Sequence, residues 1–159
     1  SNIYYTIIPD KNYFVNKDNL KLDYNKLQDM LKSNLTNLNY INIFDKLTLD
    51  NYYKTDTHWK QEDLFDVANT IANQMNFDIT NNNVINTVTT FKGSYAGRLS
   101  VTKDIDTIKT ISNPSTLNSS VYNYETKKYI FPASAVSFGY NTLDISSALF
   151  LPETASIYC

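Results

Sequence analysis

Hydrophobic positions in the first third of the chain change from strand-like to helix-like spacing and back. Residues 3–8 form an apolar run that ends at Pro9, which predicts a buried strand. Residues 23–38 carry apolar side chains at helical spacing and predict an amphipathic helix, and residues 40–44 form a second apolar run. A strand, a helix and a strand in this order predict a βαβ unit with parallel strands and a right-handed crossover.

The pattern changes again after the second apolar run. Residues 60–75 repeat apolar side chains at helical spacing and predict a second helix. Residues 79–100 combine a β-prone run of Val and Thr with two of the three glycines. Glycines permit close backbone approach, so this segment would pack over the site, and the alternative is an ordinary turn. Residues 121–131 carry alternating tyrosines and predict a strand. No repeat and no linker divides the chain, so we expect one domain over residues 1–159.

Composition excludes several classes of protein. A chain of 159 residues with 42% hydrophobic and 19% charged residues is long enough to bury a core, and no run approaches the roughly 20 apolar residues of a membrane span. A net charge of -2, with Arg98 as the only arginine, argues against nucleic acid as a partner. The single cysteine, Cys159, excludes an internal disulfide and a thiolate metal cluster, so we expect neither a metal nor another cofactor.

Residues 52–59 are the one segment that looks like chemistry, and their sequence is YYKTDTHW. The single histidine, His58, follows Asp56 by two positions. A carboxylate that accepts a hydrogen bond from one imidazole nitrogen fixes the tautomer, and the other nitrogen then takes a proton from a hydroxyl nucleophile. Asp56 and His58 are therefore the candidate orienter and general base. The alternatives are a structural histidine near the surface and a partial metal site that no second histidine completes.

The electrostatic setting of this histidine depends on the element that follows it. The predicted helix at residues 60–75 would begin beside His58, so the positive end of its dipole would oppose imidazolium while Asp56 would favour it.

Other residues around this segment are candidates for substrate binding. Tyr53, Trp59 and Tyr95 would present flat ring faces to a sugar, whereas the alternative for such aromatics is core packing. Arg98 would bind a carboxylated sugar or help to hold an oxyanion, and the alternative is a surface ion pair. Backbone amides of the glycine-containing segment would serve the same developing anion.

Three blocks in matching order resemble a known family: residues 7–11 (IIPDK), residues 52–59 and residues 91–95 (FKGSY). The chain resembles the DHHW proteins of Gram-positive bacteria, relatives of SGNH-hydrolase-like proteins that O-acetylate alginate and other exopolysaccharides outside the cytoplasm. The resemblance covers nearly all residues to about Tyr140, and Thr57 departs from the motif that gives the family its name. It implies an α/β, three-layer, SGNH-hydrolase-like (flavodoxin-like) domain in an extracellular or cell-surface protein.

The resemblance also implies a Ser-His-Asp triad, with His58 as base, Asp56 as orienter and Trp59 supporting them. The family takes its serine from a later Asp-Ser-Phe or Asp-Ser-Tyr block, which this sequence lacks. Ser146 and Ser147 are weak substitutes, so we expect the nucleophile to lie beyond Cys159 in a longer protein.

The implied reaction transfers acetyl onto, or removes it from, a polysaccharide through an acyl-serine without a cofactor. An acetyl donor and a membrane-bound acetylation machinery would be its partners. The alternative is a catalytically silent module that binds carbohydrate or a partner protein of the cell envelope.

Overall fold

A computed structural model of the chain describes residues 2–99, 103–124 and 126–130. Helices alternate with small sheets along these residues, which confirms the predicted α/β content. Each sheet among the described residues has two strands. The same residues contain no helix with the length and apolar character that crossing a membrane requires.

The described residues form two compact units, and each unit is built from two separate stretches of the chain. Unit 1 comprises Ser1–Tyr52 and Leu64–Ile79. Unit 2 comprises Tyr53–Asp63 and the described residues from Thr80 onward. The segment that carries Asp56 and His58 therefore belongs to the same unit as the glycine-containing segment.

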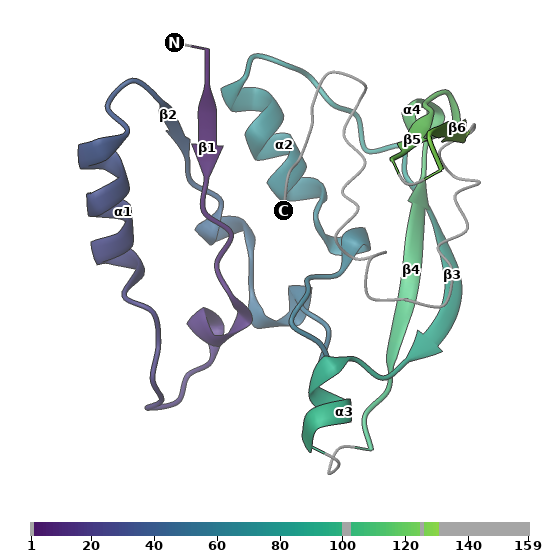
Figure 1. Ribbon diagram of the computed structural model, residues 1–159, viewed down its shortest axis with the longest axis horizontal. Helices are drawn as coiled ribbons and strands as arrows, with labels where there is room; N and C mark the ends of the chain where they lie inside the picture. The colour runs from purple at the N-terminus through teal and green to yellow at the C-terminus, as the bar shows by residue number, and fades with distance from the viewer. Residues whose placement is uncertain (1, 100–102, 125, 131–159) are drawn as a thin grey trace. The chain divides into compact units, whose positions relative to one another are not determined.

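Unit 1 contains the predicted βαβ arrangement (Figure 1). The strand β1 (Tyr4–Thr6) pairs in parallel with β2 (Asn39–Ile41), and the helix α1 (Tyr24–Asn34) connects them. The carboxylate of Asp23 caps α1 by accepting a hydrogen bond from the Lys26 N–H at 3.0 Å. The helix ends at Asn34, before the predicted residue 38. The prediction was too long because half-buried leucines in the turn that leads to β2 continue the apolar spacing.

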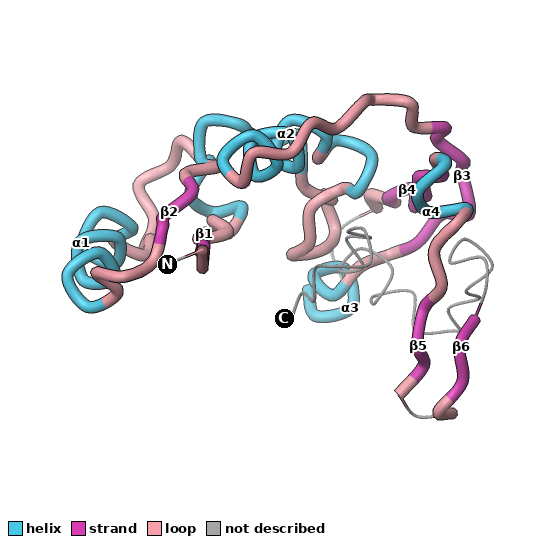
Figure 2. The backbone as a smooth tube through the Cα atoms, turned by 90° about the horizontal axis from the view of Figure 1, so that it is seen from above, coloured by secondary structure: helices cyan, strands magenta, loops and turns pink. Residues whose placement is uncertain are grey.

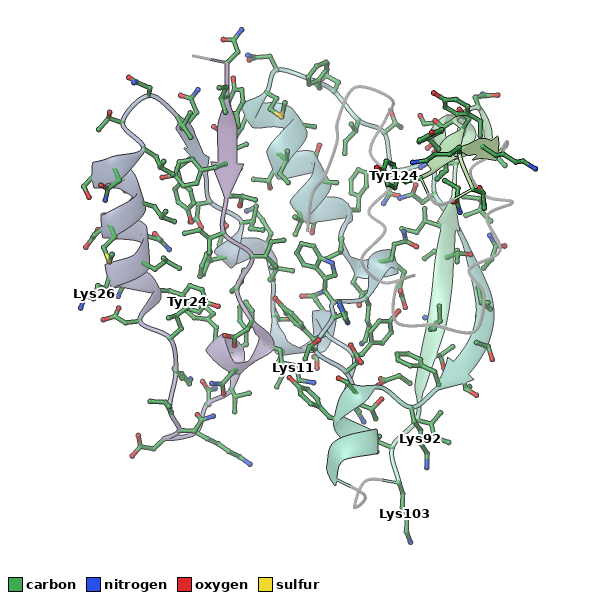
Figure 3. The ribbon with its side chains drawn as sticks, in the orientation of Figure 1. Lys11, Tyr24, Lys26, Lys92, Lys103 and Tyr124 are labelled. Atoms are coloured by element: carbon green, nitrogen blue, oxygen red, sulfur yellow. The ribbon has the colours of Figure 1, made fainter. Side chains whose placement is uncertain are left out.

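An aromatic cluster fills the space beside the first turn of α1. The ring of Tyr24 lies edge-on to those of Tyr13 and Phe44, with centroids 5.3 and 5.2 Å apart. The Tyr24 hydroxyl, labelled in Figure 3, donates to Asp10 Oδ2 at 3.1 Å and accepts the Asp10 N–H at 2.8 Å. The buried phenol thus ties α1 to the segment that follows β1.

The predicted second helix is divided in the structure. A short 3-10 turn, η4 (Gln61–Asp63), belongs to unit 2, and the helix α2 (Phe65–Gln74) begins afterwards in unit 1, where it packs beside β2. The prediction that a helix begins directly after His58, with its dipole acting on the imidazole, is therefore wrong. The other 3-10 turns are η1 (Lys11–Phe14), η2 (Phe44–Lys46) and η3 (Leu49–Asn51).

Unit 2 is organised around an antiparallel pair of strands. The strand β3 (Val84–Phe91) pairs with β4 (Asp106–Ser112), and the register runs from Val84 opposite Ser112 to Phe91 opposite Asp106. The short helix α3 (Ser94–Leu99) lies between them in sequence and next to this end of the pair (Figure 1). Most of β3 is exposed on both faces, so its sequence shows no alternation and only its Val and Thr content marks it as a strand.

The last described elements are the helix α4 (Pro114–Leu117) and the hairpin of β5 (Val121–Asn123) and β6 (Lys128–Ile130) (Figure 2). The predicted single strand at residues 121–131 is therefore wrong. The chain reverses within it, and Lys127 adopts a positive φ of 56° in the turn. Ser146 and Ser147 lie outside the described residues.

Candidate functional site

Asp56 and His58 lie in a tight loop of unit 2. The loop is closed by a hydrogen bond from the Tyr53 N–H to the His58 carbonyl at 3.0 Å. Nδ1 of His58 bonds Oδ1 of Asp56, and the His58 N–H donates to the same oxygen at 3.1 Å. An ionised carboxylate can only accept, so Nδ1 carries the proton and Nε2 is left as an acceptor. The structure brings the two predicted residues together in the arrangement that a general base requires.

Burial differs sharply between the two side chains. The Asp56 side chain is 1% exposed, whereas that of His58 is 37% exposed. An orienting carboxylate that is shielded from water keeps its partner in one geometry, and an imidazole at the surface remains accessible to a substrate. The exposure therefore matches the separate roles of orienter and base.

The second oxygen of Asp56 is held by the glycine-containing segment. The Ser94 N–H donates to Oδ2 at 2.8 Å. Burial by itself raises the pKa of Asp56, but the hydrogen bonds from the Ser94 N–H and from the imidazole and N–H of His58 outweigh it, and the pKa falls to about 2. The carboxylate is therefore ionised throughout the neutral range.

A second buried carboxylate holds the loop from the side of β4. Asp106 is 6% exposed, and its Oδ1 accepts the Lys54 N–H at 2.9 Å. Its Oδ2 accepts both the N–H and the hydroxyl of Thr55 at 2.6 Å. Sequence reasoning missed Asp106, because 51 positions separate it from Thr55 and no motif connects them.

Residues 93–95 also contact the loop through backbone hydrogen bonds. The Gly93 N–H donates to the Thr55 hydroxyl at 2.8 Å, and the Tyr95 N–H donates to the Thr55 carbonyl at 2.9 Å. A Cβ on Gly93 would lie 2.5 Å from the Thr55 carbonyl oxygen and 2.7 Å from Asp56 Oδ2. Glycine is required here for close approach. The amides of these residues bond Thr55 and Asp56, however, and do not face an open position where an oxyanion would sit.

The predicted substrate-binding residues occupy different environments. Tyr53 is 2% exposed and packs edge-to-face on Phe91 at 5.0 Å, which is the core-packing alternative. Trp59 and Tyr95 are half-buried. Arg98 belongs to α3, and its side chain lies outside the described part of the structure.

A cavity of about 250 Å³ lies in unit 2 between the start of the loop, η4 and β4. Lys54, Lys60 and Lys109 line it together with Glu62 and Asp106. The Lys109 ammonium lies 3.5 Å from Glu62 Oε1, and the Glu62 side chain is 5% exposed. Glu62 Oε2 has no hydrogen-bond partner among the described residues. No motif in the sequence connects Glu62 with Lys109.

No protein-family model, curated protein or solved structure is significantly similar to this chain. Within the described residues, no three His, Cys, Asp or Glu side chains gather in a way that would hold a metal ion. Function is therefore inferred from the geometry around Asp56 and His58 and from the three sequence blocks.

Proposed function

We propose that Asp56 and His58 are the orienter and general base of a Ser-His-Asp triad that transfers acetyl groups onto, or removes them from, a cell-surface polysaccharide. The observation that carries this proposal is the bond from His58 Nδ1 to a buried, ionised Asp56, which leaves Nε2 as a proton acceptor. The resemblance to DHHW proteins supports the choice of reaction. It also supports a three-layer SGNH-like arrangement as the architecture of the domain.

In the proposed reaction, His58 Nε2 takes the proton of a serine hydroxyl while the serine oxygen attacks the carbonyl carbon of an acetyl ester. The tetrahedral intermediate collapses, and the departing alkoxide takes the proton back from the imidazolium. A second hydroxyl, from the polysaccharide or from water, then loses its proton to Nε2 and attacks the acyl-serine. The bond from the acyl carbon to the serine oxygen breaks, and that oxygen takes the proton from the imidazolium. The ionised Asp56 stabilises the imidazolium in both halves of the reaction.

The serine in this scheme lies outside the described residues. Half-buried Trp59 and Tyr95 supply ring faces for the sugar in the proposal, and Arg98 supplies charge for a carboxylated sugar or the oxyanion. Tyr53 is left out of the substrate surface, because its ring is packed against Phe91. The protein acts at the cell surface and receives acetyl groups through a membrane-bound partner.

The test measures release of a chromogenic phenol from its acetyl ester by the natural protein that contains this sequence. His58→Ala is compared with Lys92→Ala, a change at an exposed neighbouring position of unit 2 (Figure 3). We expect His58→Ala to abolish turnover and Lys92→Ala to retain it. A fluorophosphonate label followed by peptide mass spectrometry identifies the serine. Turnover that does not depend on His58 would favour the silent carbohydrate- or partner-binding module instead.

A further inference from the structure

We propose that Asp106 and Thr55 are positioning residues for the pair of Asp56 and His58. Asp106 acts through Thr55 to fix the direction of the Asp56 carboxylate, and with it the Nδ1–H tautomer of His58. The catalytic consequence of this inference rests on the proposed function. The positioning itself is a property of the folded unit and is measured without any reaction.

Asp106 holds the backbone just before Asp56. Its two oxygens accept three hydrogen bonds from Lys54 and Thr55, at 2.6 to 2.9 Å. Hydrogen bonds to an ionised acceptor are among the stronger ones in proteins. Because Thr55 directly precedes Asp56, these bonds fix the backbone from which the Asp56 side chain projects.

The Thr55 hydroxyl makes two hydrogen bonds in this network. It donates to Asp106 Oδ2 and accepts the Gly93 N–H, so one oxygen links β4 to the segment before α3. The Thr55 carbonyl adds a bond from the Tyr95 N–H. The position of residues 93–95 over the loop therefore depends on Thr55.

Ser94 connects this arrangement to the imidazole of His58. Ser94 lies between Gly93 and Tyr95, and its N–H holds Oδ2 of Asp56 at 2.8 Å. With Oδ2 fixed, Oδ1 is left directed at His58 Nδ1. Loss of the Thr55 hydroxyl would leave the Gly93 N–H and one bond of Asp106 unsatisfied inside the unit, and the Ser94 donor would move with its neighbours.

The experiment uses nitrogen NMR of the imidazole, which is unambiguous because His58 is the single histidine. Long-range proton–nitrogen correlation distinguishes the Nδ1–H from the Nε2–H tautomer. Thr55→Val removes the hydroxyl at nearly constant volume, and Thr55→Ser keeps it. Asp106→Asn removes the ionised acceptor and provides a second, independent perturbation if Thr55→Val does not fold. Thr107→Val is the matched control, since its hydroxyl takes no part in this network among the described residues.

We expect the wild type, Thr55→Ser and Thr107→Val to show the Nδ1–H tautomer. Folded Thr55→Val and Asp106→Asn should show a mixture of tautomers. If the protein turns over acetyl esters, these two variants should also lower kcat by about 10- to 100-fold with KM nearly unchanged. A pure Nδ1–H signal in folded Asp106→Asn or Thr55→Val would overturn the positioning role. A tautomer change in a protein without esterase activity would uphold positioning and count only against the proposed function.

Discussion

Gly93 lies so close to Asp56 that no Cβ fits between the Gly93 backbone and the Asp56 side chain. The two residues are 37 positions apart in sequence (93 − 56), yet the contact determines how the orienting carboxylate is packed. A Cβ at this position would meet the Thr55 carbonyl oxygen and the Cβ of Asp56, neither of which belongs to the flexible end of a side chain.

Gly93→Ala should therefore destabilise unit 2 by about 1 to 3 kcal/mol, the usual effect of forcing an extra methyl group into a packed site. Urea unfolding followed by the fluorescence of the single tryptophan, Trp59, measures this change within the unit. Ser94→Ala is the control, since the bond to Asp56 comes from the backbone N–H and survives the substitution. Equal stability of the two variants would contradict the close contact.

Asp56 should make stability depend on pH in the acid range. Its pKa is lowered from 3.8 to about 2 in the folded protein, so folding favours the ionised form. The resulting stabilisation, about 2 kcal/mol, is complete above roughly pH 4 and is lost as the pH falls to 2. Asp56→Asn should flatten this part of the pH profile of unfolding, whereas the exposed Asp18→Asn should not. An unchanged profile in Asp56→Asn would be the contrary result.

Asp56→Asn should also test the orienting role in catalysis. An asparagine at this position would offer its amide to Nδ1 or accept from it without charge, so the imidazolium would lose its stabilising partner. We expect kcat for acetyl-ester turnover to fall by about 10³- to 10⁴-fold, with KM little changed. If kcat fell by less than about tenfold in a well-folded variant, Asp56 would have a structural role only.

Lys109→Met should destabilise unit 2 because it leaves the buried Glu62 carboxylate without its cation. Lys109 is itself 40% exposed, so we expect about 1 to 2 kcal/mol by Trp59 fluorescence, below the effect of a fully buried pair. Combining it with Glu62→Gln should recover part of the loss. Lys92→Met, at an exposed position of the same unit, should change stability by less than about 0.5 kcal/mol. Equal effects of the two lysine substitutions would rule out a stabilising pair.

Tyr24→Phe should destabilise unit 1, since it removes a hydroxyl that both donates to and accepts from Asp10. We expect about 1 to 2 kcal/mol, measured by the far-ultraviolet circular dichroism of α1 and α2 during urea unfolding. Tyr13→Phe is the matched control on a tyrosine that is 41% exposed. Similar losses in both variants would show that the hydroxyl bonds of Tyr24 contribute little.

The parts of this protein that could be predicted from sequence are those encoded over short distances. The parallel pair and its connecting helix followed from apolar spacing, and Asp56 and His58 were found because they are two positions apart. Asp106 could not be found this way, because its contribution arises only when β4 reaches the loop. The strand β3 was indicated only by its β-prone Val and Thr content, because hydrophobic periodicity reflects burial and most of β3 is exposed.

Element ends show the same limit. Apolar spacing continued past the end of α1 and across the gap between η4 and α2, because residues in turns also bury apolar side chains. The alternating tyrosines at residues 121–131 fit a single strand and a hairpin equally well. The antiparallel register of β5 and β6 identifies the reversal, and it brings the rings of Tyr122 and Tyr129 to a centroid distance of 5.0 Å.

The support of the loop by later residues has a consequence for how the site is made during synthesis. Asp56 and His58 leave the ribosome together, but Gly93 and Asp106 follow Thr55 by 38 and 51 positions. Until those residues have emerged, the nascent chain contains both reactive side chains without the bonds that aim them. The pair is therefore fully held only after β4 has been synthesised, and a ribosome paused before β4 would carry Asp56 and His58 without these supporting bonds.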